Sequence, residues 1–247
     1  MDIYALAGHS RWAQVKHKKA LTDAKKGKTF SKIARMITVA SKEKGADPET
    51  NPALRTAIEK ARALGMPSDN IERAILRGSG VEAKDALAAV QYEVFGPGGA
   101  AFLISGITDN KNRTTSEIKH ILAEHGGCLA DRGAVEWLFR TVRTIELDEQ
   151  EQEIKGDELE LVLIDAGAED IGRDGAILIA RFPPERIPHA KSILRQRAVT
   201  IRTEYADSVP KTRLEIENTE TKHKISELLE KLDDHDDMQE IYTNVNL

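Results

Sequence analysis

The chain has 247 residues, of which 31% are charged and only 4% are aromatic, and its net charge is −5. This length and composition predict one large domain or two to three small ones, with cores of Ala, Ile, Leu and Val. The single cysteine, Cys128, excludes an intramolecular disulfide framework, and the longest apolar run, 100–107, is far shorter than the roughly 20 residues of a membrane-spanning helix. The N-terminus shows no secretory signal, so we expect a cytoplasmic protein.

The first 80 residues predict a helical segment. Apolar residues spaced i, i+3, i+4 and i+7 indicate an amphipathic helix around 30–37 that ends at Gly45. A second helix starts with Asn51 as its N-cap and stops at Gly65, and a third runs from Pro67 to Gly78. Three short helices can enclose one small core.

After residue 80 the pattern alternates between strands and helices. Residues 90–94 and 100–108 predict a hairpin, and a capping box at Thr114–Glu117 predicts the start of a helix that ends at Gly126. The remaining elements are predicted, in chain order, as strands at 135–139 and 143–147, a helix at 157–166, a hairpin with its turn at 172–175, a helix from 183 to about 197, a β-branched stretch at 199–203, a break at 208–210, a strand at 211–216, a helix at 218–232 and a strand at 239–243. Residues 133–206 alone suffice for a small ferredoxin-like sandwich, and 81–132 can combine with 207–247 around this insertion.

The charge is distributed unevenly along the chain. Residues 1–80 hold 16 Lys and Arg against 8 Asp and Glu, a net charge of +8, whereas residues 81–247 carry −13. Nine of the basic residues lie between 11 and 35, where Asp23 is the single acid. A basic segment of this density is typical of proteins that bind nucleic acid, because neutralising phosphates releases counterions.

The candidate nucleic-acid site is this basic segment, and its residues are Arg11, Lys16, Lys18, Lys19, Lys25, Lys26, Lys28, Lys32 and Arg35. If the segment is helical, five of them fall within an arc of about 80° and face outward, away from the apolar side. These five are Lys18, Lys25, Lys28, Lys32 and Arg35. A break at Gly27 would divide this stripe without lowering the charge density. Trp12 either stacks on bases or packs on the helical core, and we favour packing. A membrane surface is disfavoured because the opposite face is rich in alanine.

A second candidate anion site is the loop 109–114, with Lys111, Asn112, Arg113 and Thr114 as its residues. This loop leads into a helix whose free backbone N–H groups and dipole favour anions. A polar loop with a good N-cap explains the same residues equally well.

Enzyme and metal motifs are poorly matched. Gly27–Thr29 mimics the end of a phosphate-binding loop, but Thr22 stands where the first glycine is needed. Cys128 has no cysteine partner for zinc, and the seven histidines lack paired ligand spacing. The acidic run Asp233–Asp237 could hold a divalent ion weakly, although a solvated turn is the favoured interpretation. We therefore predict a protein that is not an enzyme and has no metal and no cofactor.

Seven short motifs in the first 114 residues are shared with one protein family. They are Ala7-Gly8-His9-Ser10-Arg11-Trp12-Ala13, Lys16-His17-Lys18-Lys19-Ala20, Asp23-Ala24-Lys25-Lys26-Gly27-Lys28, Asn51-Pro52-Ala53-Leu54-Arg55, Met66-Pro67 with Asn70-Ile71, Gly96-Pro97-Gly98-Gly99, and Thr108-Asp109-Asn110-Lys111-Asn112-Arg113-Thr114. Through them the chain resembles the YebC/PmpR proteins of bacteria, whose mitochondrial relatives activate translation of a cytochrome oxidase subunit. Two departures are Arg11, where the family usually has Lys, and the six residues before Ala7, where it typically begins with Met.

The resemblance implies three domains: a basic helical domain at 1–80, an α/β domain formed by 81–132 and 207–247, and a further α/β domain at 133–206 inserted into it. The predicted fold class is therefore α+β and multidomain, with an N-terminal three-helix domain and two ferredoxin-like α/β sandwich domains.

The resemblance also implies a non-enzymatic regulator of gene expression that binds promoter DNA. Some members resemble ribosome-associated factors that help translation through difficult sequences such as proline runs, and the partner would then be ribosomal or transfer RNA. The low aromatic content argues against sequence-specific readout of single strands in either case. A monomer is slightly favoured, and no membrane partner is expected.

Overall fold

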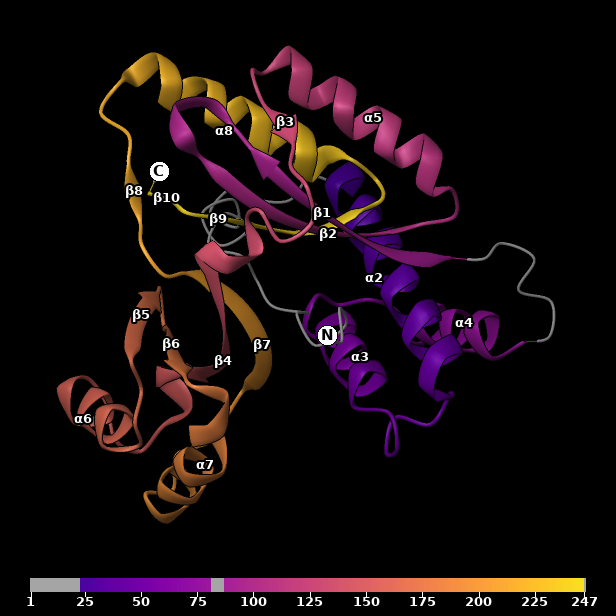
Figure 1. The fold of residues 1–247 in the computed structure, drawn as a ribbon. Helices are drawn as coiled ribbons and strands as arrows, with labels where there is room; N and C mark the ends of the chain where they lie inside the picture. Colours follow the sequence, from indigo (N-terminus) through magenta and orange to yellow (C-terminus); the bar gives the residue numbers. More distant parts are fainter. Residues whose placement is uncertain (1–22, 81–86, 247) are drawn as a thin grey trace. The chain divides into compact units, whose positions relative to one another are not determined.

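The structure is a computed structural model that describes residues 23–80 and 87–246, with side chains from residue 27 onward. Two compact units make up the chain (Figure 1). The first contains residues up to Phe139 together with those from Pro210, and the second contains Arg140–Val209.

Three helices form the N-terminal part of the first unit: α2 (Asp23–Lys44), α3 (Pro52–Ala63) and α4 (Ser68–Ser79). Their apolar faces enclose one core, which includes Ile33, Ile37, Leu54 and Ile71. The three predicted helices are thus confirmed. The helix break at Gly27 that the sequence left open does not occur, because α2 continues through this residue. One unbroken helix therefore carries every predicted basic residue from Lys25 to Arg35.

Two buried features hold these helices together. The predicted N-cap Asn51 is fully buried and accepts a hydrogen bond from the Leu54 N–H at 3.1 Å. Its amide donates at 2.8 Å to the carbonyls of Ala40 and Gly45, so the same side chain ties the end of α2 to the start of α3. At the other contact, a Cβ on Gly78 would lie 2.2 Å from the Thr38 carbonyl oxygen, so α4 approaches α2 as closely as only glycine permits.

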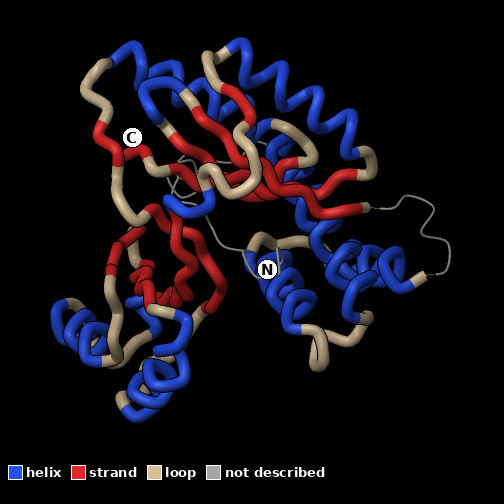
Figure 2. The backbone as a smooth tube through the Cα atoms, in the orientation of Figure 1, coloured by secondary structure: helices blue, strands red, loops and turns tan. Residues whose placement is uncertain are grey.

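The rest of the first unit is a four-stranded sheet with the order β3-β1-β2-β9. Its strands are β1 (Ala88–Phe95), β2 (Ala101–Thr108), β3 (Cys128–Leu129) and β9 (Met238–Thr243). Helices α5 (Lys111–Glu124) and α8 (Thr219–Asp234) pack side by side on one face over a core that includes Phe102, Ile118 and Leu228 (Figures 1 and 2). The predicted hairpin of β1 and β2 is confirmed, and its partner β9 comes from the far end of the chain.

Two sequence predictions fail in this unit. A strand over 135–139 was wrong: a short 3-10 helix, η3 (Glu136–Leu138), occupies most of the segment. The cause is the Glu93 carboxylate, which accepts hydrogen bonds from the backbone N–H groups of Gly133, Val135 and Glu136 at 2.5, 2.6 and 2.8 Å and so bends the chain. A strand over 211–216 is reduced to β8 (Leu214–Glu215), which pairs in parallel with β10 (Val245–Asn246).

The second unit contains most of a four-stranded sheet and two helices. In chain order its elements are β4 (Phe139–Asp148), α6 (Asp157–Asp165), β5 (Asp170–Asp174), β6 (Ile177–Phe182), α7 (Ile187–Gln196) and β7 (Thr203–Pro210), with the short turns η4 (Glu149–Glu151) and η5 (Pro184–Arg186). The strand order is β5-β6-β4-β7. The predicted break at 208–210 was wrong, because β7 runs to Pro210; proline is tolerated there since β7 is an edge strand.

Candidate nucleic-acid interface

The predicted basic residues fall into three groups in the structure. Arg11, Lys16, Lys18 and Lys19 lie outside the described residues. Lys25 and Lys26 belong to the first turns of α2, and their side chains also lie outside the described part. The remaining group, Lys28, Lys32 and Arg35, is spaced i, i+4 and i+7, which places the three side chains on one face of the helix.

This face does not point freely into solvent as predicted, because its three side chains contact the end of α8 and the turn that follows it. We call this segment, Asp233–Asp237, the acidic turn. Lys28 Nζ donates to the Asp234 carbonyl and lies 3.5 Å from Asp236 Oδ1, and Lys32 Nζ donates to the Asp233 carbonyl at 2.7 Å. The expectation of an outward-facing stripe is therefore wrong for these residues.

The arrangement has a simple electrostatic explanation. The last carbonyls of a helix carry a partial negative charge and lack partners within the helix. Asp233 and Asp234 end α8, and their carbonyl oxygens receive the two lysine ammonium groups. A basic helix face thus neutralises both the C-terminus of α8 and the carboxylates behind it.

Asp237 is the centre of the polar cluster, and its side chain is only 3% exposed. Arg35 Nη1 lies 2.6 Å from Asp237 Oδ1 and also donates to the Asp236 carbonyl at 3.0 Å. On the other oxygen, Oδ2, Arg113 Nη2 donates at 2.9 Å and the Thr114 hydroxyl at 2.7 Å. Arginines from α2 and α5 therefore hold one buried carboxylate.

These contacts determine the protonation state of Asp237. Burial alone raises the pKa of the carboxyl, but hydrogen bonds from Thr114, Arg113, Thr108 and Arg35 outweigh it and lower the pKa to about 2. The carboxylate is therefore ionised at every physiological pH, and it balances two guanidinium groups that would otherwise repel each other.

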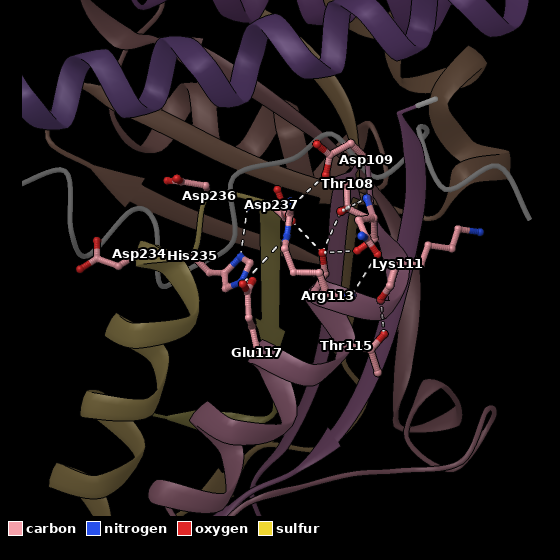
Figure 3. Close-up of polar contacts among 12 residues, drawn as sticks. Thr108, Asp109, Lys111, Arg113, Thr115, Glu117, Asp234, His235, Asp236 and Asp237 are labelled. Atoms are coloured by element: carbon pink, nitrogen blue, oxygen red, sulfur yellow. Dashed lines mark hydrogen bonds and ion pairs between the residues drawn. The ribbon is translucent and has the colours of Figure 1, made fainter. Parts of the chain in front are cut away.

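The second predicted anion site lies at the start of α5 and is part of the same cluster (Figure 3). The helix begins at Lys111, three residues before the predicted capping box, because Asn110 is the N-cap and accepts from the Arg113 N–H at 3.1 Å. Of the four predicted residues, Arg113 and Thr114 bind Asp237, whereas Lys111 and Asn112 are exposed and Figure 3 shows Lys111 pointing away. The anion held here is a carboxylate of the chain itself.

A further ion pair joins the helices to the sheet. Lys60 of α3 lies 2.7 Å from Glu240 of β9, and the two side chains are 17% and 6% exposed. Sequence reasoning missed Lys60, Glu240, Asp237 and His235 as contact residues. The acidic run was the one available signal, but nothing local indicates which basic residues face it.

Glu117, His235 and Asp237 bring ligand atoms within 4.8 Å of one another. Their existing partners do not fit a bound metal ion. His235 Nδ1 accepts from the Asp237 N–H at 3.1 Å, which leaves Nε2 as the donor to Glu117 Oε2 at 2.9 Å. Both Asp237 oxygens already bind guanidinium groups, whose charge would repel a cation. The cluster is an internal ion-pair network.

Together, a basic three-helix part and acidic α/β parts define a modular α+β protein whose charges are segregated along the chain. Two family models match it: the TACO1/YebC N-terminal domain at residues 10–81 and the TACO1/YebC second and third domain at residues 87–245. The chain belongs to the TACO1/YebC family.

Relatives and a solved structure agree with this assignment. A probable transcriptional regulatory protein of Halothermothrix orenii is 41% identical over 242 residues, which is 98% of this chain and 96% of the relative. One of Dictyoglomus thermophilum has the same identity and coverage. The crystal structure of a conserved hypothetical protein from Aquifex aeolicus matches with a TM-score of 0.82 and 40% identity, covering 96% of this chain and 97% of that one. No helix within residues 23–80 and 87–246 is long and apolar enough to span a membrane.

Proposed function

We propose that this protein is a non-enzymatic, nucleic-acid-binding regulator of gene expression that contacts phosphates through the basic segment 11–35. The observation that carries the proposal is the charge distribution: nine basic residues and one acid in this segment, within a chain whose residues 81–247 are strongly acidic. An acidic remainder repels phosphates, so contact is confined to the basic end.

Two findings support the proposal. Relatives at 41% identity are named probable transcriptional regulatory proteins, which favours DNA as the partner. In the described part of the basic segment, Lys28, Lys32 and Arg35 bind carbonyl and carboxylate oxygens along one face of a continuous helix. The same spacing suits a row of phosphate oxygens.

We also infer that the chain has three domains, the third of which is inserted into the second. The order β4, α6, β5, β6, α7, β7, with strands arranged β5-β6-β4-β7, supports a ferredoxin-like plan for the inserted part near 133–206.

The alternative is a ribosome- or RNA-associated translation factor, which has the same chemical requirement for basic side chains. A sucrose gradient of cell lysate, with and without nuclease, combined with sequencing of crosslinked nucleic acid, separates the two. Promoter DNA crosslinks without a ribosomal fraction support the transcription proposal, whereas co-sedimentation with ribosomes and ribosomal RNA crosslinks support translation.

The test uses a reversal variant that leaves the contacts of Lys28, Lys32 and Arg35 intact: Lys16→Glu with Lys18→Glu and Lys19→Glu. Its matched control changes three exposed lysines of the acidic part in the same way: Lys119→Glu, Lys222→Glu and Lys231→Glu. We expect crosslinks to be lost in the first variant and retained in the control. Equal crosslinking by both variants would contradict the assignment of the basic segment.

A further inference from the structure

The contact between α2 and the acidic turn has a consequence for the basic face. Lys28, Lys32 and Arg35 are positioned by three carbonyl oxygens and two carboxylates, all of which accept from the basic groups that would otherwise bind phosphate oxygens. We propose that the acidic turn is an autoinhibitory contact: it competes with nucleic acid for this face of α2, so that binding of a phosphate backbone there requires the contact to open. This inference rests on the proposed function of the basic segment.

The acidic turn and a phosphate backbone exclude each other from this face. Arg35 directs Nη1 to both the Asp236 carbonyl and the Asp237 carboxylate, and Lys28 reaches both a carbonyl and a carboxylate of the turn. A phosphate brought to these groups would lie beside the carboxylates of Asp236 and Asp237. Like charges at such distances repel, so the closed contact disfavours the phosphate even where a lysine hydrogen remains available.

The ion pairs between α2 and the acidic turn differ in their exposure to solvent. The outer pair, Lys28 and Asp236, is accessible to solvent, with side-chain exposures of 35% and 72%. Salt and water screen such a pair strongly. In the inner pair, Arg35 binds the Asp237 carboxylate, which is nearly removed from solvent. An incoming polyanion can therefore displace the outer lysine before the inner arginine.

Opening of the contact between α2 and the acidic turn does not leave the buried charge of Asp237 unpaired. When Arg35 leaves, Asp237 keeps the Arg113 guanidinium on α5 and the Thr114 hydroxyl. Breaking a buried ion pair is costly mainly because it strands one charge, and here that cost is avoided.

The test neutralises the other three carboxylates of the turn and keeps the buried Asp237. The full chain carries Asp233→Asn, Asp234→Asn and Asp236→Asn; the matched control carries Glu151→Gln, Glu153→Gln and Asp165→Asn, three exposed carboxylates of the other unit. Both variants change the net charge equally. Binding is measured by fluorescence anisotropy with a labelled 24-base-pair DNA duplex and a labelled RNA hairpin, each at several salt concentrations.

We expect the turn variant to bind either probe about threefold more tightly than wild type, because exposed ion pairs contribute at about this level. Its plot of log affinity against log salt should also steepen by about one unit, since each phosphate contact then releases its counterions without first breaking an internal ion pair. The control should match wild type in slope. A role in stability alone would change the unfolding midpoint and leave the slope unchanged.

The outcomes separate the two proposals. If wild type binds and the turn variant matches the control in affinity and slope, the autoinhibitory contact is refuted and the proposed function stands. If wild type, the turn variant and the control all fail to bind either probe at low salt, both proposals are overturned.

Discussion

Replacing Asp237 by asparagine tests how strongly the buried carboxylate organises the contact between α2, α5 and the acidic turn. Asparagine keeps the shape but removes the charge between Arg35 and Arg113, and its NH₂ group must face a donor on one side. A hydrogen bond to a charged group contributes about 1.5–3 kcal/mol, so we expect the free energy of unfolding to fall by about 2–3 kcal/mol at pH 7.

The pH dependence provides an independent estimate. Because the pKa of Asp237 is lowered to about 2 in the folded protein, its ionised form contributes stability above its unfolded pKa, near 3.8, and this stability is lost as the pH falls toward 2. The shift corresponds to about 1–2 kcal/mol once partial screening is allowed for. Wild type should therefore lose this much more stability than Asp237→Asn between pH 5 and pH 2.

Urea unfolding followed by circular dichroism measures both effects, with the slope of free energy against urea as a check that the unfolded state is unchanged. Asp236→Asn is the matched control, because the Asp236 side chain is 72% exposed and should change stability by less than about 0.5 kcal/mol. The reasoning is refuted if Asp237→Asn is as stable as this control, or if its pH profile runs parallel to that of wild type.

Two further predictions concern the folded core. Glu93→Gln should lower the free energy of unfolding by about 2–3 kcal/mol, because one backbone N–H at the η3 turn loses its acceptor. Thermal or urea melts measure this change, and an unchanged midpoint would show that the turn forms without the carboxylate. Burial raises the pKa of Glu93, but the three backbone hydrogen bonds lower it overall, so wild type should lose this stability in acid and the variant should not. Gly78→Ala should cost about 1–3 kcal/mol, since its Cβ would overlap the Thr38 carbonyl, whereas Gly27→Ala, inside a helix with open space around its Cβ and no positive φ, should not lower stability. Equal effects of the two alanine substitutions would contradict the close packing of α2 and α4.

The sequence predicted those parts of the fold that depend on local chemistry. The N-cap at Asn51, the turn of the β1–β2 hairpin and the apolar stripes of α3 and α4 are all encoded within a few residues of where they act. It failed where a distant residue decides the local structure: Glu93 bends the segment around Val135 from 42 positions away. No periodicity within 135–139 could indicate that partner.

The same limit applies to the site. The sequence showed the density of the basic segment and predicted the helix around 30–37, but Arg35 and Asp237 are 202 positions apart and meet only because β9 returns to the sheet beside β2. The acidic run was assigned to solvent for the same reason. Charge composition predicted the kind of partner, while the tertiary fold determines which basic residues are already occupied.

The central claim is that nucleic acid contacts the basic segment 11–35. The most direct measurement is ultraviolet crosslinking of the full chain to nucleic acid in cells, followed by mass spectrometry of the crosslinked peptides. The account predicts that crosslinked peptides come from residues 11–35. Crosslinks concentrated in 140–209, with none in the basic segment, would contradict it.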